Sequence, residues 1–223
     1  MMNSETLERI AHCVEYGKVN LQSPYPPDMK GQDGAYELTR KALDEGIEPG
    51  LVLTEGLVKG MERIGVKFRA RQVFVPHVLM SAKAMNTAMV HLKPFFQSGA
   101  VKRKGTLLIG TVAGDLHDIG KNIVAMMIEG GGWEVINLGV DIKDEELIAT
   151  INQYPGCVVA LSALLTTTMV NMEKTVRAIK HNNPNTRVLI GGAPVSREFC
   201  EEIGADFYSP DPQGAVEYLN TLA

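Results

Sequence analysis

Residues 106–122 read TLLIGTVAGDLHDIGKN, and this stretch decides the fold. Its first seven residues are mostly apolar and predict a buried β-strand over 106–112. A glycine, two carboxylates and a histidine follow, and a second apolar pattern directly after them predicts a helix over 121–130. A polar loop between a buried strand and a helix is typical of the carboxyl edge of an open α/β sheet, where such sheets bind ligands.

Strand–helix alternation continues through the rest of the chain. Further strands are predicted over 133–138, 157–163, 187–192 and 206–209, and further helices over 144–153, 169–182, 196–203 and 214–222. The continuous apolar run over 158–161 fits a parallel strand that is covered on both faces. Residues 106–223 are therefore expected to form an α/β domain with a flavodoxin-like, doubly wound parallel sheet of five strands.

The first hundred residues have the periodicity of helices instead. Apolar side chains recur at spacings of three and four within 7–14, 38–43, 51–61 and 78–92. This pattern predicts a four-helix bundle domain over 1–93. Residues 94–105, which contain proline, glycine and a Lys-Arg-Lys run, are the predicted linker, and 17–34 form a predicted long loop after the first helix.

Composition limits the class of protein. The chain is 45% hydrophobic and 22% charged, which is typical of a globular protein. It has no apolar run of about 18 residues and no signal-peptide pattern, so we expect a cytoplasmic protein without a membrane partner. Its three cysteines are widely spaced and odd in number, and they are expected to be free thiols.

Charge is distributed unevenly along the sequence. Residues 1–104 carry 15 Lys/Arg against 11 Asp/Glu, whereas residues 105–223 carry 7 against 15. A nucleic-acid-binding protein usually has a stronger basic face, so no nucleic-acid partner is expected. The asymmetry favours two domains with different surfaces for protein partners.

Asp115 and His117 are the candidate chemical pair in the opening stretch. In an extended loop the two side chains can approach each other, and a carboxylate on one ring nitrogen leaves the other nitrogen with its lone pair. That arrangement suits a metal ligand or a general base. Gly114 and Gly120 leave space where the backbone must come close to a bulky ligand.

Two further motifs are expected at the same edge of the sheet. The third strand continues into Ser162-x-Leu164-x-Thr166, and strand alternation would place these three side chains on one face, beside the His117 loop. Gly191-Gly192 follows the fourth strand, and a turn of small residues there would open a groove.

Together these motifs resemble the three-part signature of cobalamin-binding domains. Residues 55–68 and 74–82 also resemble the helical domain that precedes this fold in methyl-transferring members. From about Tyr36 onward the chain is similar to the corrinoid proteins of methylamine-type methyltransferase systems and to the cobalamin-binding region of methionine synthase. One departure is the loop over 17–34, which is longer than the first turn usual in that family.

The resemblance implies roles for individual residues. His117 would be the axial cobalt ligand in place of the cofactor's own dimethylbenzimidazole, with Asp115 hydrogen-bonded to it and Ser162 extending the relay. The implied cofactor-binding residues are Gly114, Leu116, Asp118, Ile119, Gly120, Leu164, Thr166, Gly191, Gly192, Ala193 and Asp211. Glu55, Phe68 and Val75 of the helical domain would cover the methyl-bearing face.

The resemblance also implies a function, that of a methyl carrier whose cofactor is methylcobalamin or a related corrinoid. Cobalt(I) would accept a methyl group from a substrate-specific methyltransferase acting on a methylated amine or a similar one-carbon donor. A second methyltransferase would then pass it to tetrahydrofolate or coenzyme M, and a reductive activation protein would be a further partner. No catalytic residue beyond the cofactor and no turnover by this chain alone are expected.

A cobalamin-binding sensor is the alternative, because it would use the same histidine loop. Such sensors usually carry a DNA-binding domain, and no helix-turn-helix with a basic recognition helix is evident before the bundle. A response-regulator receiver would need an aspartate where Ser162 stands, and a flavodoxin would need a phosphate loop rich in Ser and Thr. The helical domain of methyl type argues against an adenosylcobalamin mutase subunit.

Overall fold

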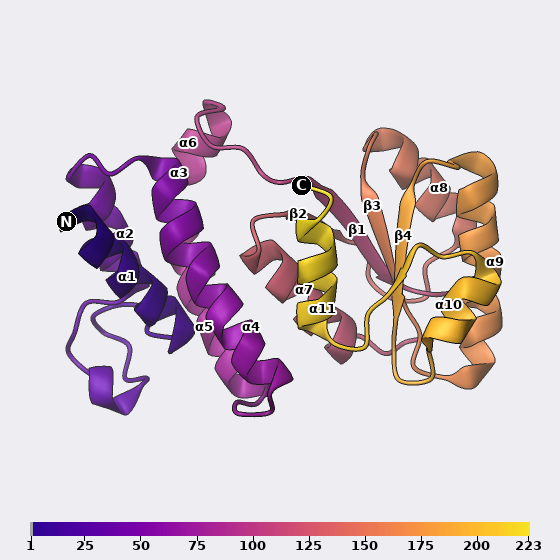
Figure 1. Ribbon diagram of the computed structural model, residues 1–223, viewed down its shortest axis with the longest axis horizontal. Helices are drawn as coiled ribbons and strands as arrows, with labels where there is room; N and C mark the ends of the chain where they lie inside the picture. Colours follow the sequence, from indigo (N-terminus) through magenta and orange to yellow (C-terminus); the bar gives the residue numbers. More distant parts are fainter. Residues whose placement is uncertain (1) are drawn as a thin grey trace. The chain divides into compact units, whose positions relative to one another are not determined.

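The computed structural model describes residues 2–223. These residues form two compact units, a helical unit up to Arg103 and an α/β unit from Lys104 onward, with the short segment Gly130–Gly132 grouped with the helical unit (Figure 1). None of the helices described is long and apolar enough to cross a bilayer.

The helical unit contains the four helices of the predicted cap. They are α1 (Met2–Glu15), α2 (Ala35–Asp44), a continuous helix from Pro49 to Arg69, and α5 (Val75–Met89). The continuous helix consists of α3 (Pro49–Leu51), the π-helical segment η2 (Val52–Val58) and α4 (Lys59–Arg69). Helix α1 packs against α2, η2, α4 and α5, so it is central to the bundle. A further short helix, α6 (Lys93–Gln97), overlaps the first residues of the linker that the sequence predicts over 94–105.

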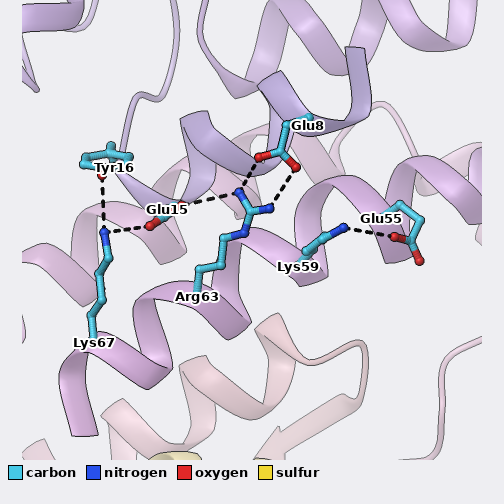
Figure 2. Close-up of polar contacts among 7 residues, drawn as sticks. All are labelled: Glu8, Glu15, Tyr16, Glu55, Lys59, Arg63 and Lys67. Atoms are coloured by element: carbon cyan, nitrogen blue, oxygen red, sulfur yellow. Dashed lines mark hydrogen bonds and ion pairs between the residues drawn. The ribbon is translucent and has the colours of Figure 1, made fainter. Parts of the chain in front are cut away.

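Ion pairs join α1 to α4 on the surface of this bundle (Figure 2). Arg63 of α4 donates to both carboxylate oxygens of Glu8, at 2.6 and 2.8 Å. Lys67, one turn further on, lies 2.7 Å from Glu15 and donates to the hydroxyl of Tyr16 at 3.3 Å. A two-point contact between a guanidinium and a carboxylate favours one relative orientation, so this pair links the facing surfaces of α1 and α4.

The long loop over 17–34 is anchored to the bundle. Lys18 is fully buried, and its amine donates to the carbonyl of Ser23 at 2.9 Å. The loop also contains a 3-10 turn, η1 (Pro27–Met29), whose Met29 side chain is buried. The sequence correctly predicts a long loop here, and the hydrogen bond from Lys18 to Ser23 joins two parts of this loop.

The α/β unit is built on a five-stranded parallel sheet. Its strands are β1 (Thr106–Thr111), β2 (Glu134–Asn137), β3 (Val158–Ser162), β4 (Arg187–Gly191) and β5 (Phe207–Tyr208). They lie in the order β2-β1-β3-β4-β5, and every neighbouring pair is parallel. This order is that of the flavodoxin-like doubly wound sheet, so the predicted fold class is confirmed.

Helices cover both faces of this sheet, as Figure 1 shows. Helices α7 (Ile119–Gly130) and α11 (Pro212–Asn220) lie on one face; α8 (Asp144–Gln153), α9 (Thr166–Asn182) and α10 (Arg197–Ile203) lie on the other. The face under α8, α9 and α10 holds a dense apolar core that includes Leu108, Val159 and Val176. The switch in winding direction occurs between β1 and β3, which places the loops after these strands at the usual ligand edge.

One local prediction from the sequence is wrong. Strand β3 ends at Ser162, and helix α9 begins at Thr166, with Leu165 in an extended conformation just before it. Strand alternation therefore does not continue from Ser162 to Thr166. The reason is that the three threonines over 166–168 form the first turn of a helix, three residues earlier than the apolar pattern indicates.

Candidate functional site

Asp115 is the buried centre of the loop after β1, with no exposed surface. Its Oδ1 accepts hydrogen bonds from the backbone N–H of His117 at 3.1 Å and lies 2.8 Å from Nδ1 of the same residue. Its Oδ2 accepts from the backbone N–H of Leu164 at 2.7 Å and from the hydroxyl of Thr168 at 2.8 Å. One carboxylate thus joins the β1–α7 loop to the start of α9.

These contacts determine the charge of Asp115. Burial opposes ionisation, but the hydrogen bonds from Leu164, His117 and Thr168 outweigh it and hold the pKa of this carboxyl well below its usual range. The carboxylate is therefore ionised at neutral pH and can only accept hydrogen bonds. The proton shared with His117 belongs on Nδ1, so in the neutral form of the imidazole the lone pair is on Nε2.

His117 itself presents this lone pair at the surface of the unit. Its side chain is 52% exposed, although its partner Asp115 is buried. The hydroxyl of Thr111 donates to the backbone carbonyl of His117 at 2.8 Å, and the amide of Asn171 donates to the carbonyl of Ala113 at 2.7 Å. Because backbone and ring are both held, the imidazole has a defined orientation.

A groove of about 540 Å³ runs from this loop along the sheet face that α7 and α11 cover. Its floor is apolar and includes Ile109 of β1, Ala160 of β3 and Leu189 of β4. His117, which is half-exposed, and Asp211, whose carboxylate caps α11 through the N–H of Gly214, both line the groove. The groove is large enough for an elongated organic group that ends at the imidazole.

Glycines shape the groove in two different ways. A Cβ on Gly120 would meet no atom within 4 Å, so this residue leaves open space along the groove wall. Gly192 has a φ of +131°, and a Cβ there would clash with the carbonyl oxygen of Ala163. The backbone therefore requires glycine at position 192, whereas the folded chain leaves room for a side chain at position 120.

Most residues predicted from the sequence lie together at this edge. Those lining the groove are Leu116, His117, Asp118, Ile119, Gly120, Ser162, Leu164, Gly191, Gly192, Ala193 and Asp211. Thr166 is exposed at the start of α9 and is not among the lining residues. Gly114 is not among them either; with a φ of +80°, it donates its N–H to Asp141 at 2.7 Å and serves the turn.

The polar relay differs from the expected one. Thr168, rather than Ser162, bonds to Asp115. The predicted relay residue Ser162 lines the groove at the end of β3 instead. The helical first turn of α9 brings Thr168 beside the carboxylate, and the sequence pattern alone does not distinguish Thr168 from the two threonines before it.

The three predicted cap residues lie in the helical unit. Glu55 is in the π-helical segment and forms a 3.5 Å ion pair with Lys59. Phe68 is in the last turn of α4 and Val75 is the first residue of α5, and both side chains are half-buried. Their role over a cofactor stays a prediction.

Comparison with known families gives two matches. A family model described as a B12 binding domain matches residues 105–216, which include the whole groove. A second model, also described as a B12 binding domain, matches residues 32–93 in the helical unit.

Relatives and solved structures agree with these matches. A corrinoid protein of Desulfitobacterium hafniense is 38% identical over 196 residues, which are 86% of this chain and 91% of that protein. Monomethylamine corrinoid protein 2 of Methanosarcina acetivorans is 41% identical and covers 92% of each chain. A methanol:cobalamin methyltransferase complex from Methanosarcina barkeri has a chain that matches with a TM-score of 0.80 at 27% identity, over 98% of this chain and 79% of that one. A cobalamin-binding protein from Desulfitobacterium hafniense matches with a TM-score of 0.75 at 26% identity, over 99% and 98%.

Proposed function

The chain belongs to the corrinoid proteins with B12 binding domains, and we propose that it carries a methyl group on a corrinoid held through His117. The observation that carries the proposal is the bond between Asp115 and Nδ1 of His117, a residue that lines the groove. A neutral imidazole whose second nitrogen is bound to a carboxylate is a good ligand for a transition metal.

The described residues fit such a cofactor. His117 would hold the cobalt of the cofactor, and the residues that line the groove would hold its nucleotide tail. The open space beside Gly120 and the apolar floor suit that tail. When bound, the corrinoid supplies a cobalt centre that accepts and releases a methyl group, and the protein supplies ligation, orientation and access.

The partners follow from the same proposal. Relatives are named as trimethylamine and monomethylamine corrinoid proteins, and one structural match is part of a methyltransferase complex. We therefore propose that one methyltransferase, specific for a methylated amine, loads this chain. A second enzyme acting on tetrahydrofolate or coenzyme M unloads it, and a reductive activation protein restores the cofactor after oxidation.

Ligation is tested by electron paramagnetic resonance of the chain labelled with ¹⁵N-histidine and reconstituted with cob(II)alamin. Histidine ligation predicts doublet splitting from one ¹⁵N nucleus, and His117→Ala should lose it. Splitting from unlabelled nitrogen in the wild type would show that the cofactor keeps its own base, and the ligation proposal would be wrong.

Methyl carriage is tested separately with candidate donors. The candidate donors are trimethylamine, dimethylamine, monomethylamine and methanol. For each donor, the reconstituted and reduced chain is incubated with that donor and the methyltransferase specific for it. Carriage predicts methylation of the bound corrinoid with one donor, visible in its absorption spectrum. Light- or cobalamin-dependent DNA binding without methylation would favour the sensor instead.

The cap is a further part of the proposal. If Phe68 covers the methyl group, Phe68→Ala should speed photolysis of the methyl-loaded protein, because a shielded radical pair recombines more often. Phe74→Ala is the matched control, since Phe74 is 68% exposed and lies outside the predicted cap residues. Equal photolysis rates in Phe68→Ala and the wild type would contradict a cap at Phe68.

A further inference from the structure

Lys121 is an unexpected residue in the wall of the groove. It is the third residue of α7, is 3% exposed, and donates to two amide oxygens, Oδ1 of Asn122 at 2.8 Å and Oδ1 of Asn137 at 2.6 Å. Neither acceptor is charged, and a cation in the first turn opposes the helix dipole. Burial accordingly lowers the pKa of this amine, an effect that Asp118 opposes. Such locally unfavourable choices are expected where a function requires them.

The contacts of Lys121 fix the orientation of the Asn122 amide. An ammonium group has only donors, so the atom of Asn122 that faces it must be the oxygen. The same oxygen accepts from the amide nitrogen of Asn137 at 3.0 Å. The Nδ2 group of Asn122 must then point the other way, and it donates to the carboxylate of Asp118 at 3.0 Å.

Asp118 is the residue next to His117 and lines the groove. Its backbone carbonyl also accepts from the N–H of Asn122 at 2.8 Å, so Asn122 holds both its backbone and its side chain. The carbonyl of His117 is held on the β1 side by Thr111. The peptide that carries the imidazole is therefore fixed from both directions, and Lys121 supports one of them.

We propose that Lys121 is a positioning residue that orients the Asn122 amide toward Asp118 and so holds the His117 segment where its imidazole meets the bound corrinoid. The inference rests on the proposed function. Asn137 connects the end of β2 to this network, because Asn137 also accepts the N–H of Gly139 at 3.0 Å. Hydrogen bonds thus connect Asn137 at the end of β2, through Lys121 and Asn122, to the segment that contains His117 and Asp118.

Two variants test this role. Lys121→Met keeps the stem of the side chain but removes the charge and its donors. Asn122→Asp keeps an acceptor for Lys121 and gains an ion pair, yet it places a second carboxylate against Asp118. Asn122→Asp leaves Lys121 with an acceptor, so it tests the link to Asp118 even where Lys121→Met does not fold. Lys180→Met is the matched control, because Lys180 also holds two oxygens, on Thr186 and Asp206, elsewhere in the same unit.

The first readout is the ¹⁵N-histidine splitting of the protein reconstituted with cob(II)alamin. We expect Lys121→Met and Asn122→Asp to lose most of the doublet, and Lys180→Met to keep it. The second readout is hydrogen exchange of residues 115–122 without cofactor, which should be about tenfold faster in both variants, the factor expected for one lost hydrogen bond to a charged group.

The outcomes separate this inference from the proposed function. A wild-type protein without the doublet disproves histidine ligation, and the exchange rates of the cofactor-free variants then decide the role of Lys121. Wild-type splitting and exchange in both variants would overturn the inference while leaving ligation by His117 intact. Equal effects in Lys180→Met would also overturn it, since the role would then be general stability.

Discussion

The hydroxyl of Thr168 lies 2.8 Å from Oδ2 of Asp115, across 53 positions of sequence. This contact joins the first turn of α9 to the loop after β1, and both side chains are buried. It completes the set of donors around a carboxylate whose other oxygen holds His117. The position of the carboxylate that holds His117 therefore depends on Thr168, which belongs to a different βα unit.

Thr168→Val should lower the free energy of unfolding of the α/β unit by about 1–3 kcal/mol, because it leaves a buried charge with one donor fewer at unchanged volume. The measurement is urea unfolding followed by fluorescence of Trp133, the chain's one tryptophan, which is 3% exposed. Ser162→Ala is the control and should cost less than about 0.5 kcal/mol. The opposite ranking would restore Ser162 to the relay.

Two glycines of the groove should respond oppositely to alanine. Gly120→Ala adds a methyl group into open space within a helix, so stability should hold or rise by up to about 1 kcal/mol while corrinoid affinity falls. Gly192→Ala would bring a Cβ against the carbonyl of Ala163, so the unit should unfold at lower urea concentration. Titration with cobalamin, monitored by absorbance, and the Trp133 unfolding curve measure the two effects. Unchanged affinity in Gly120→Ala would show that the bound group does not extend along α7.

The sequence predicted the sheet and the position of the site for a clear physical reason. Buried parallel strands are continuous apolar runs. Polar residues and glycines that directly follow such a run, such as Asp115 and Gly192, lie at the carboxyl edge of the sheet. The relay could not be predicted in the same way. Whether Thr168 or Ser162 reaches Asp115 depends on where β3 ends and α9 begins, and element boundaries are set by tertiary contacts that local patterns do not contain.

The same limit applies to the polar network of Lys121. In the sequence, Lys121 and Asn122 stand at the start of the helix predicted over 121–130, and the local pattern does not indicate what they contact. Lys121 is buried where it bonds to Asn137, which the parallel register brings opposite Ile109 of β1. Pairing between strands, rather than spacing along the chain, thus creates this part of the site.

Acid should weaken the α/β unit through Asp115. The pKa of this carboxyl is lower in the folded than in the unfolded chain, so its contribution to stability is fully present above the ordinary aspartate value of about 3.9 and is lost as pH falls below it. Asp115→Asn should therefore be less stable than the wild type at pH 7, with a difference that narrows below about pH 4. Urea unfolding at pH 7, 5, 4 and 3 tests this. A constant difference across the series would mean that the charge of Asp115 contributes nothing and only its shape matters.

The ion pairs of the helical unit should contribute modestly and should be sensitive to salt. Arg63 makes a two-point contact with Glu8 between α1 and α4, whereas Lys59 pairs with Glu55 within one helix at 3.5 Å (Figure 2). Both are partly exposed, so Arg63→Met should cost up to about 1 kcal/mol and Lys59→Met about 0.3–0.5 kcal/mol. Methionine keeps much of the apolar stem of each side chain, so the comparison isolates the charged group. Thermal unfolding followed by circular dichroism at 222 nm, in low salt and in 1 M NaCl, measures both. Because screening weakens exposed pairs, the cost of Arg63→Met should shrink in 1 M NaCl, and a cost that salt leaves unchanged would instead assign the effect to packing between α1 and α4.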